Sequence, residues 1–325
     1  MNKDKLSILN ATSLHQDGGL TVLKIFLKYD FHKIYFDSRL KKLFINSFLN
    51  KLYLDFYFFF NISKKKIIYL SGTPPIIKNK AYIICCFQNS NIFYNQFNFF
   101  KWIFSKDLIR YIFFSLFKKN VDIWIVFSPL AKFLLVKNGI LKKNIKLVKI
   151  FDFKKKKKIN QKKKYDFIYP ASILKHKNHL NLIFALILLA KKNIYPKLLL
   201  TINKKEIFNN ILIKLIFKFK LKVTCKYFYN SIDKKYNESI ALIYPSLNET
   251  IGIPIIEAYN HDLYILTCNR IYAKQFIKPS LVFDPLSPKD IAAKIEDFLI
   301  NKKSFKKGIL IKNNKFTYSK LKNII

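Results

Sequence analysis

The chain has 325 residues, 51% of them apolar, which is enough for two domains with separate hydrophobic cores. Its formal net charge of +41 suggests an anionic partner, but only three of its 60 basic residues are arginine. Arginine is the preferred side chain for bidentate contacts to phosphate and guanine, so this shortage argues against nucleic acid as a partner. The joint excess of Lys, Ile, Asn, Phe and Tyr indicates A+T-rich coding as the main source of the charge.

The first half of the chain alternates segments typical of strands and of helices. Short apolar runs between polar or turn-forming residues indicate buried strands, and apolar residues at helical spacing indicate helices. We expect strands at 6–10, 67–70, 82–87, 121–127 and 145–151, and helices at 20–29, 99–117 and 129–138. Such alternation is typical of a parallel sheet covered by helices.

Glycines and polar residues near the ends of these strands are the candidates for an acceptor site in this half. They are Gly18 and Gly19 after the first strand, Gln88 and Asn89 after strand 82–87, Ser128 after strand 121–127, and Arg110, one of the few arginines. A glycine pair lets the backbone approach a ligand closely, although it also suits a plain tight turn. The two amides could reach an acceptor or could simply cap their own loop.

No segment has the properties of a membrane span or of a zinc site. Residues 81–100 are uncharged but crowded with Asn and Gln, and 52–62 is short and interrupted by Asp55. The N-terminus lacks the apolar core of a signal peptide. The four cysteines lie in apolar runs without zinc-ligand spacing, so we expect reduced, buried thiols in a cytoplasmic protein. The lysine excess leaves the inner face of an anionic plasma membrane as a candidate partner.

The second half begins after a lysine-rich stretch at 154–164, which we expect to be a solvated linker. The alternation then restarts, with strands at 166–169, 197–202, 223–227, 240–244 and 264–268 and helices at 178–191, 204–219 and 288–300. Two such halves predict two domains that face a central cleft. In parallel sheets of this kind, ligands bind at the carboxyl ends of the strands.

The stretch IYPSLNETIGIPIIEAYNHD, residues 243–262, carries the most specific chemistry. A buried strand is followed by a loop with Glu249, and Gly252 and Pro254 then open a helix that contains Glu257. The N–H groups at such a helix N-terminus suit a diphosphate, and flanking carboxylates can accept hydrogen bonds from sugar hydroxyls. A plainer interpretation is that Glu257 favours the helix dipole and Glu249 is a solvated loop residue.

This stretch resembles the signature of the family 4 (group 1) glycosyltransferases, which have the GT-B fold. Their motif has two glutamates eight positions apart with a glycine, and often a proline, between them. The resemblance implies that Glu249 contacts the donor sugar and that Glu257 contacts the ribose of the nucleotide. It also assigns Thr250, Ile251 and Gly252, which lead into the helix, to the donor.

The segment YPASILKHKNHL, residues 169–180, resembles the part of the same family that holds the donor diphosphate. The resemblance implies a phosphate-binding role for Lys177, and it places Ser172 where the family usually has an arginine. Lys175 is a candidate substitute for that missing cation. His176 and His179 flank Lys177, but no third ligand is in view, so we expect no metal site. The family generally needs no bound metal, and the resemblance implies no cofactor here.

We therefore expect an α/β protein of the GT-B type with two Rossmann-like domains. Residues 1–153 form the acceptor-binding domain, 154–164 the linker and 165–302 the nucleotide-sugar domain, with 303–325 as a helical tail that packs back on the first domain. The resemblance implies a retaining transfer of a sugar from a nucleotide-sugar donor to a glycan or lipid-linked acceptor in surface-polysaccharide assembly. Two alternatives are a degenerate GT-B scaffold, favoured by Ser172, and a lysine-rich protein that binds nucleic acid.

Overall fold

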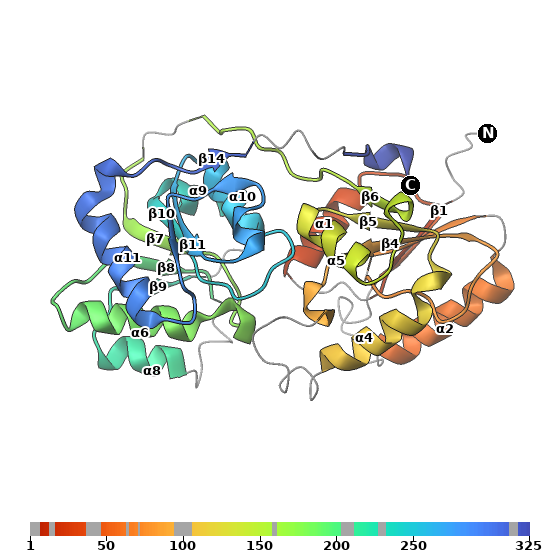
Figure 1. The fold of residues 1–325 in the computed structure, drawn as a ribbon, viewed down its shortest axis with the longest axis horizontal. Helices are drawn as coiled ribbons and strands as arrows, with labels where there is room; N and C mark the ends of the chain where they lie inside the picture. The colour runs from red at the N-terminus through yellow and green to blue at the C-terminus, as the bar shows by residue number, and fades with distance from the viewer. Residues whose placement is uncertain are drawn as a thin grey trace. The chain divides into compact units, whose positions relative to one another are not determined.

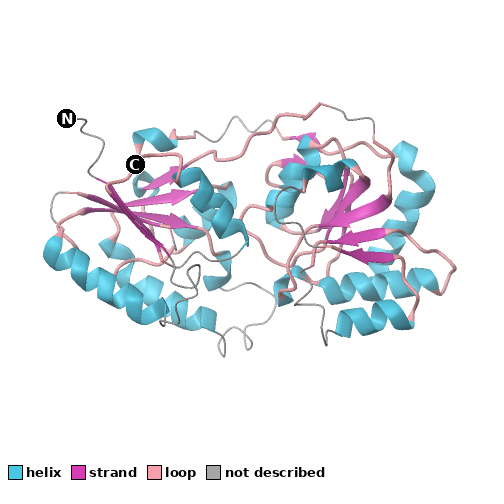
Figure 2. Ribbon diagram, turned by 180° about the vertical axis from the view of Figure 1, so that it is seen from behind, coloured by secondary structure: helices cyan, strands magenta, loops and turns pink. Residues whose placement is uncertain are grey.

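The computed structural model describes residues 7–12, 17–36, 47–62, 65–70, 72–93, 106–157, 161–202, 211–226, 232–311 and 318–325. The chain divides into two compact units (Figure 1), of which unit 1 contains residues 1–150 and 314–325 and unit 2 contains residues 151–313. Each unit has a parallel sheet with helices packed on it (Figure 2), which confirms the predicted fold class. None of the described helices is long and apolar enough to cross a membrane.

Unit 1 is built on a sheet with the strand order β2-β1-β3-β4-β5-β6, all parallel. Its strands are β1 (Ser7–Ala11), β2 (Lys33–Phe36), β3 (Lys66–Tyr69), β4 (Tyr82–Phe87), β5 (Ile123–Val126) and β6 (Ile145–Leu147). Its helices are α1 (Asp17–Phe26), α2 (Ser47–Asn61), α4 (Lys106–Phe117) and α5 (Pro129–Lys137), with 3₁₀ turns η3 (Ser90–Ile92), η4 (Lys118–Asn120), η5 (Lys142–Asn144) and η9 (Leu321–Asn323). Every predicted strand of this half is present.

The helices α2, α4 and α5 cover one face of this sheet. Phe58 of α2, Phe114 of α4 and Leu135 of α5 are buried in a single cluster with Trp124 of β5. Parallel strands covered on both faces read as continuous apolar runs, which is why β4 and β5 were recognisable from the sequence. The last described residues, 318–325, return to this unit, where Ser319 forms a β-bridge with Val148.

Unit 2 is built on a second parallel sheet with the strand order β13-β11-β10-β7-β8-β9. Its strands are β7 (Tyr165–Tyr169), β8 (Leu198–Leu200), β9 (Val223–Cys225), β10 (Ser239–Tyr244), β11 (Tyr264–Cys268) and β13 (Leu281–Phe283), and β12 (Ile277–Lys278) pairs with β14 (Ile309–Leu310) in a small antiparallel sheet. Its helices are η6 (Lys175–Lys177), α6 (His179–Ala190), α8 (Ile211–Lys218), α9 (Asp233–Asn237), α10 (Ile253–Asn260), η7 (Ile271–Lys274), α11 (Pro288–Asn301) and η8 (Lys302–Ser304).

Two features differ from the sequence expectations, and two expected helices are described only in part. The sequence does not predict the strand β2 or the helix α2, and β2 is a short, half-exposed edge strand. The helices expected at 99–117 and 204–219 are helical where the structure describes them, as α4 and α8, and their first parts lie outside the described residues. Strands β5, β6 and β9 are shorter than their apolar runs suggested.

The described residues of the lysine-rich stretch are mostly exposed, and several of them contact unit 2. Lys155 pairs with Asp262, and Lys156 pairs with Asp233 at 2.6 Å. Lys164 pairs at 2.9 Å with Glu238, whose side chain is fully buried. Each carboxylate near this stretch is shared between two lysines or between a lysine and a histidine. This sharing follows from the scarcity of acidic residues in the chain.

Candidate functional site

The sheet of unit 2 has a topological switch point between β7 and β10. From β7 the chain proceeds through β8 to β9 on one side, and it then returns to form β10 on the other side of β7. The connections that leave β7 and β10 therefore run in opposite directions at the carboxyl ends of these strands. A crevice at such a point is the usual ligand site of an open parallel sheet.

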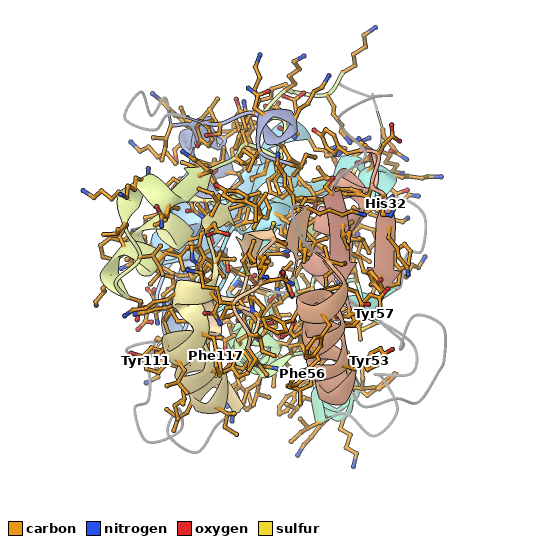
Figure 3. All side chains as sticks on the ribbon, turned by 90° about the vertical axis from the view of Figure 1, so that its right-hand side faces the viewer. His32, Tyr53, Phe56, Tyr57, Tyr111 and Phe117 are labelled. Carbon is orange, nitrogen blue, oxygen red and sulfur yellow. The ribbon has the colours of Figure 1, made fainter. Side chains whose placement is uncertain are left out.

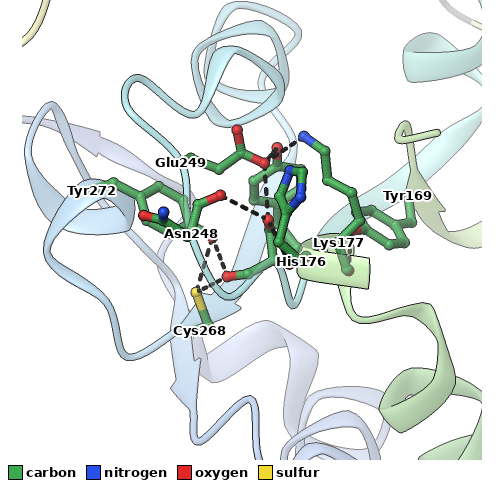
Figure 4. Close-up of polar contacts among 9 residues, drawn as sticks. Tyr169, His176, Lys177, Asn248, Glu249, Cys268 and Tyr272 are labelled. Carbon is green, nitrogen blue, oxygen red and sulfur yellow. Dashed lines mark hydrogen bonds and ion pairs between the residues drawn. The ribbon is translucent and has the colours of Figure 1, made fainter. Parts of the chain in front are cut away.

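The two loops that leave β7 and β10 bring Lys177 and Glu249 into contact. Lys177 ends the turn η6 after β7, and Glu249 lies in the loop after β10. The ammonium of Lys177 donates to Oε1 of Glu249 at 2.5 Å (Figure 4). The side chains are only 13% and 16% exposed, so water screens this ion pair weakly. The structure therefore joins two predicted site residues that are 72 positions apart.

Two further groups hold the same oxygen of Glu249. Oε1 accepts a hydrogen bond from the phenol of Tyr244 at 2.9 Å and from the hydroxyl of Ser246 at 2.8 Å. Oε2 has no hydrogen bond to any residue that the structure describes. The carboxylate is thus fixed through one oxygen, and its other oxygen can accept a hydrogen bond from a ligand hydroxyl.

A layer of buried contacts beneath the pair fixes both loops. The phenol of Tyr272, on η7, donates to the carbonyl of Ser246 at 2.6 Å, and the thiol of Cys268 donates to the same carbonyl at 3.1 Å. The N–H of Leu247 donates to the carbonyl of His176 at 2.7 Å, which joins the β10 loop to η6. Residues with such support have little freedom to move, so the ion pair is preorganised.

Asn178, directly after Lys177, makes the sharp turn into α6. Its φ angle is 60°, in the left-handed region, which asparagine tolerates better than most residues. Its buried side-chain amide donates to the carbonyls of Pro245 at 3.2 Å and Pro285 at 2.7 Å. One side chain therefore ties together the loops that follow β7, β10 and β13.

The loop after Glu249 leads into the N-terminus of α10. Gly252 caps the helix with φ at 75°, and a Cβ there would meet Ile255 and Tyr272 at 3.2 Å. The side-chain amide of Gln275 donates to the carbonyls of Thr250 at 3.0 Å and Ile251 at 3.1 Å. In the first turn Pro254 has no N–H, and the N–H of Ile255 donates to the carbonyl of Gly252 at 2.9 Å. The N–H of Ile253 is therefore the one that the first turn presents at the electropositive end of the helix dipole.

Glu257 lies on the second turn of α10 and does not contact the ion pair. Its Oε2 accepts a hydrogen bond from the phenol of Tyr236 at 2.7 Å, and Oε1 has no partner among the described residues. Burial raises the pKa of this carboxyl above its ordinary value, because burial disfavours the charged form. A partly buried carboxylate with one open oxygen suits a pair of ligand hydroxyls.

The other predicted residues in the segment after β7 differ in exposure and in their contacts. Lys175 is exposed and has no ion-pair partner among the described residues. Ser172 is partly buried, and its carbonyl accepts from the N–H of Leu174. His179 is buried against Tyr169, with ring centroids 4.7 Å apart. Within the described part of the chain, no group of three or more His, Cys, Asp or Glu side chains could hold a metal ion.

The candidates of unit 1 have mostly local contacts. Gly18 and Gly19 lie in the first turn of α1, because the helix begins at Asp17, and not in the loop expected before it. The amide of Gln88 donates to the carbonyl of Leu70 at 2.9 Å, so it joins the loops after β3 and β4, and Asn89 follows it. Ser128 is buried and caps α5 by accepting from the N–H of Ala131 at 3.1 Å. Arg110 is exposed and pairs with Asp107 at 2.7 Å.

Sequence reasoning missed the residues that position the pair, namely Tyr169, Tyr244, Tyr272 and Asn178. The phenol of Tyr169 donates to the carbonyl of Lys177, and Tyr244 contacts Glu249 directly. A signal was present, since a tyrosine ends both β7 and β10, where the apolar run gives way to the loop. Their roles depend on the contact of two distant loops, which a sequence pattern does not show.

Comparisons with known proteins place this geometry in a family. A family model described as glycosyl transferases group 1 matches residues 150–315. No curated protein matches the chain. Among solved structures, a glycosyltransferase from Rickettsia africae is 18% identical over 93% of this chain and 89% of its own, with a TM-score of 0.61. Anabaena HepE in complex with UDP and glucose is 13% identical over 92% and 91%, with a TM-score of 0.63.

A third structure, TarM, is 18% identical with a TM-score of 0.58, over 79% of this chain and 52% of its own. The chain therefore spans about half the length of TarM. At these identities the three likenesses show the fold, which is GT-B with two Rossmann-like domains.

Proposed function

Because the chain belongs to the glycosyl transferases group 1 family, we propose that it transfers a sugar from a nucleotide-sugar donor to a glycan or lipid-linked acceptor. The observation that carries the proposal is the contact between Lys177 and Glu249 at the switch point of the unit 2 sheet. This pair combines a cation with an oriented carboxylate, next to a helix N-terminus that favours anions.

The donor diphosphate would lie between the Lys177 ammonium and the first turn of α10. Both groups stabilise negative charge, and that charge increases on the leaving diphosphate as the bond to the sugar breaks. In this structure the ammonium is neutralised by Glu249. A bound phosphate would compete for the ammonium, while Tyr244 and Ser246 keep the carboxylate in place.

The open oxygens of the two glutamates would recognise the rest of the donor. Oε2 of Glu249 would accept from a hydroxyl of the transferred sugar, and Oε1 of Glu257 from a ribose hydroxyl. Thr250, Ile251 and Gly252 would contribute backbone groups, and Lys175 a second cation in place of the family arginine at Ser172. Retention of anomeric configuration is proposed from the family resemblance.

Unit 1 would bind the acceptor, with Gly18, Gly19, Gln88 and Asn89 near the carboxyl ends of its strands as candidate contacts. Ser128 and Arg110 are weaker candidates because an N-cap and an ion pair already engage them. We propose a role in surface-polysaccharide assembly at the inner face of an anionic membrane, supported by the charge of +41.

The first experiment is a thermal-shift series with UDP, GDP and their sugar conjugates, because a ligand that binds only the native state raises the melting temperature. UDP is the first choice, since the HepE structure contains UDP and glucose and the pneumococcal O-GlcNAc transferase structure contains UDP and GlcNAc. Donor turnover with the stabilising nucleotide sugar is then measured for the native chain, Glu249→Gln and Lys177→Met.

The matched control is a second lysine–glutamate pair in the same unit. Lys192 and Glu296 pair at 2.6 Å on the surface, away from the switch point. We expect Lys192→Met and Glu296→Gln to retain turnover, and Glu249→Gln and Lys177→Met to lose most of it. Equal turnover in all four variants would refute the proposed site. Chelation of divalent metals with EDTA should leave turnover unchanged, because the proposed phosphate charges are neutralised by Lys177 and α10.

A scaffold without catalysis is the second candidate, and Ser172 in place of an arginine favours it. This alternative predicts nucleotide-induced stabilisation without donor turnover by the native chain. The two measurements above therefore separate it from a transferase.

A further inference from the structure

Two neighbouring helices of unit 1 expose a set of large apolar side chains. On α2 these are Tyr53, Phe56 and Phe60, and on α4 they are Ile109, Ile112 and Leu116, each about half exposed or more. The spacings of three and four residues put each set on one face of its helix. We call these six residues the aromatic-aliphatic face.

The opposite sides of both helices are already used by the core. Phe58 of α2 and Phe114 of α4 are buried in the cluster on one face of the unit 1 sheet. Figures 1 and 3 show the two helices side by side, and in Figure 3 Phe56 and Phe117 lie between them. The exposed side chains of the two helices therefore lie on neighbouring elements of one unit. Large apolar side chains gathered on neighbouring helices mark an interaction site.

The charges around this face are positive or neutralised. Asp55 of α2 is buried and accepts from the phenol of Tyr69 at 2.9 Å and the N–H of Ile76 at 3.1 Å. On α4, Asp107 is paired with Arg110. At one border the exposed Lys33 lies 5.0 Å from the ring of Tyr35 and 5.9 Å from the ring of Tyr57. An occupant of this face thus meets apolar rings and cations.

We infer that the aromatic-aliphatic face is the surface by which this protein docks on a bilayer with anionic headgroups. Tyr and Phe side chains favour the boundary between headgroups and acyl chains, where lysine and arginine contact anionic lipid. Helix α2, with 15 residues and one apolar outer face, suits a position in the plane of that boundary. A second copy is a poor occupant, because two chains of formal charge +41 repel each other.

The inference rests on the proposed function only for the anionic membrane as a partner, and it is tested without sugar transfer. The full chain is co-sedimented with vesicles of phosphatidylcholine alone and of phosphatidylcholine with phosphatidylglycerol, at low and high salt. The variant carries Phe56→Ser and Phe60→Ser. The control carries Phe217→Ser on α8 and Ile300→Ser on α11, at residues that are 77% and 73% exposed in unit 2.

We expect the native chain and the control to bind the anionic vesicles, with binding weakened by salt. The Phe56→Ser, Phe60→Ser variant should bind them about 100-fold more weakly, because each buried ring contributes about tenfold. Binding that needs no anionic lipid, no binding at all, or an equal loss in the control would overturn the inference. So would self-association in vesicle-free solution that the double variant abolishes, which would assign the face to a second copy. Thermal shifts with nucleotides, measured without vesicles, report on the donor site separately.

Discussion

The phenol of Tyr236 donates a 2.7 Å hydrogen bond to Oε2 of Glu257, so the ring on α9 fixes the carboxylate on α10. Tyr236 is fully buried and stacks on His261, with the ring planes 16° apart. Glu257 is therefore held by one oxygen, as Glu249 is. This shared arrangement leads to the first prediction.

Glu257→Gln should lower nucleotide affinity while it leaves stability at neutral pH equal or higher. Burial raises the pKa of Glu257, so between its unfolded and folded pKa values the native state binds more protons, and stability falls as pH rises through that window. The amide removes this cost and still accepts from Tyr236. Melting temperatures at pH 4 to 8 and UDP-induced shifts measure both effects. A variant with lower stability at neutral pH and unchanged nucleotide affinity would contradict the prediction.

Tyr244→Phe should lower kcat/KM by about tenfold without loss of the fold, because one of three donors to Oε1 of Glu249 is removed.

Lys177→Met should lower kcat/KM by about 100-fold or more, because the charge that stabilises the leaving group is lost. The measurement is donor turnover at limiting substrate.

A double-mutant cycle tests whether these donors act on one carboxylate. Tyr244→Phe and Ser246→Ala should be non-additive in kcat/KM, since both donate to the same oxygen. Additive losses would mean that the two hydroxyls act independently of Glu249.

Gly252→Ala should destabilise the protein by about 1–3 kcal/mol and weaken nucleotide binding. The φ angle of 75° is unfavourable for alanine, and its Cβ would press on Ile255 and Tyr272 at 3.2 Å. Gly139→Ala is the control, because its φ is 85° but its Cβ would meet only the flexible end of Lys118. We expect both variants to unfold at lower urea concentrations and only Gly252→Ala to lose nucleotide affinity.

His179→Phe should flatten the pH dependence of stability between about pH 4 and 6.5. Burial lowers the pKa of His179 from 6.5 to about 4, so in this window the unfolded chain binds more protons and native stability is lost as the pH falls. The loss for this one group is at most about 3 kcal/mol. Urea unfolding at several pH values measures it.

Much of the fold was predictable because it depends on local patterns. The runs YIICCF and YILTC are continuous and apolar between polar boundaries, and both are strands buried in parallel sheets. Ser128-Pro129 and Ser287-Pro288 mark the starts of α5 and α11, where each serine accepts an N-cap hydrogen bond. In contrast, β2 is an edge strand with a weak apolar pattern, and its neighbour in the sheet decides that it is a strand.

By itself, the sequence predicted which residues would bind a nucleotide sugar, from the spacing of Glu249 and Glu257 around a glycine and from a lysine just before α6. Only the tertiary structure decided which of them meet. The return of the chain from β9 to β10 beside β7 places Glu249 against Lys177, and tyrosines at the ends of those strands reach both loops. Periodicity and capping act within a few residues, whereas this contact depends on strand order, which is set by the packing of the whole sheet.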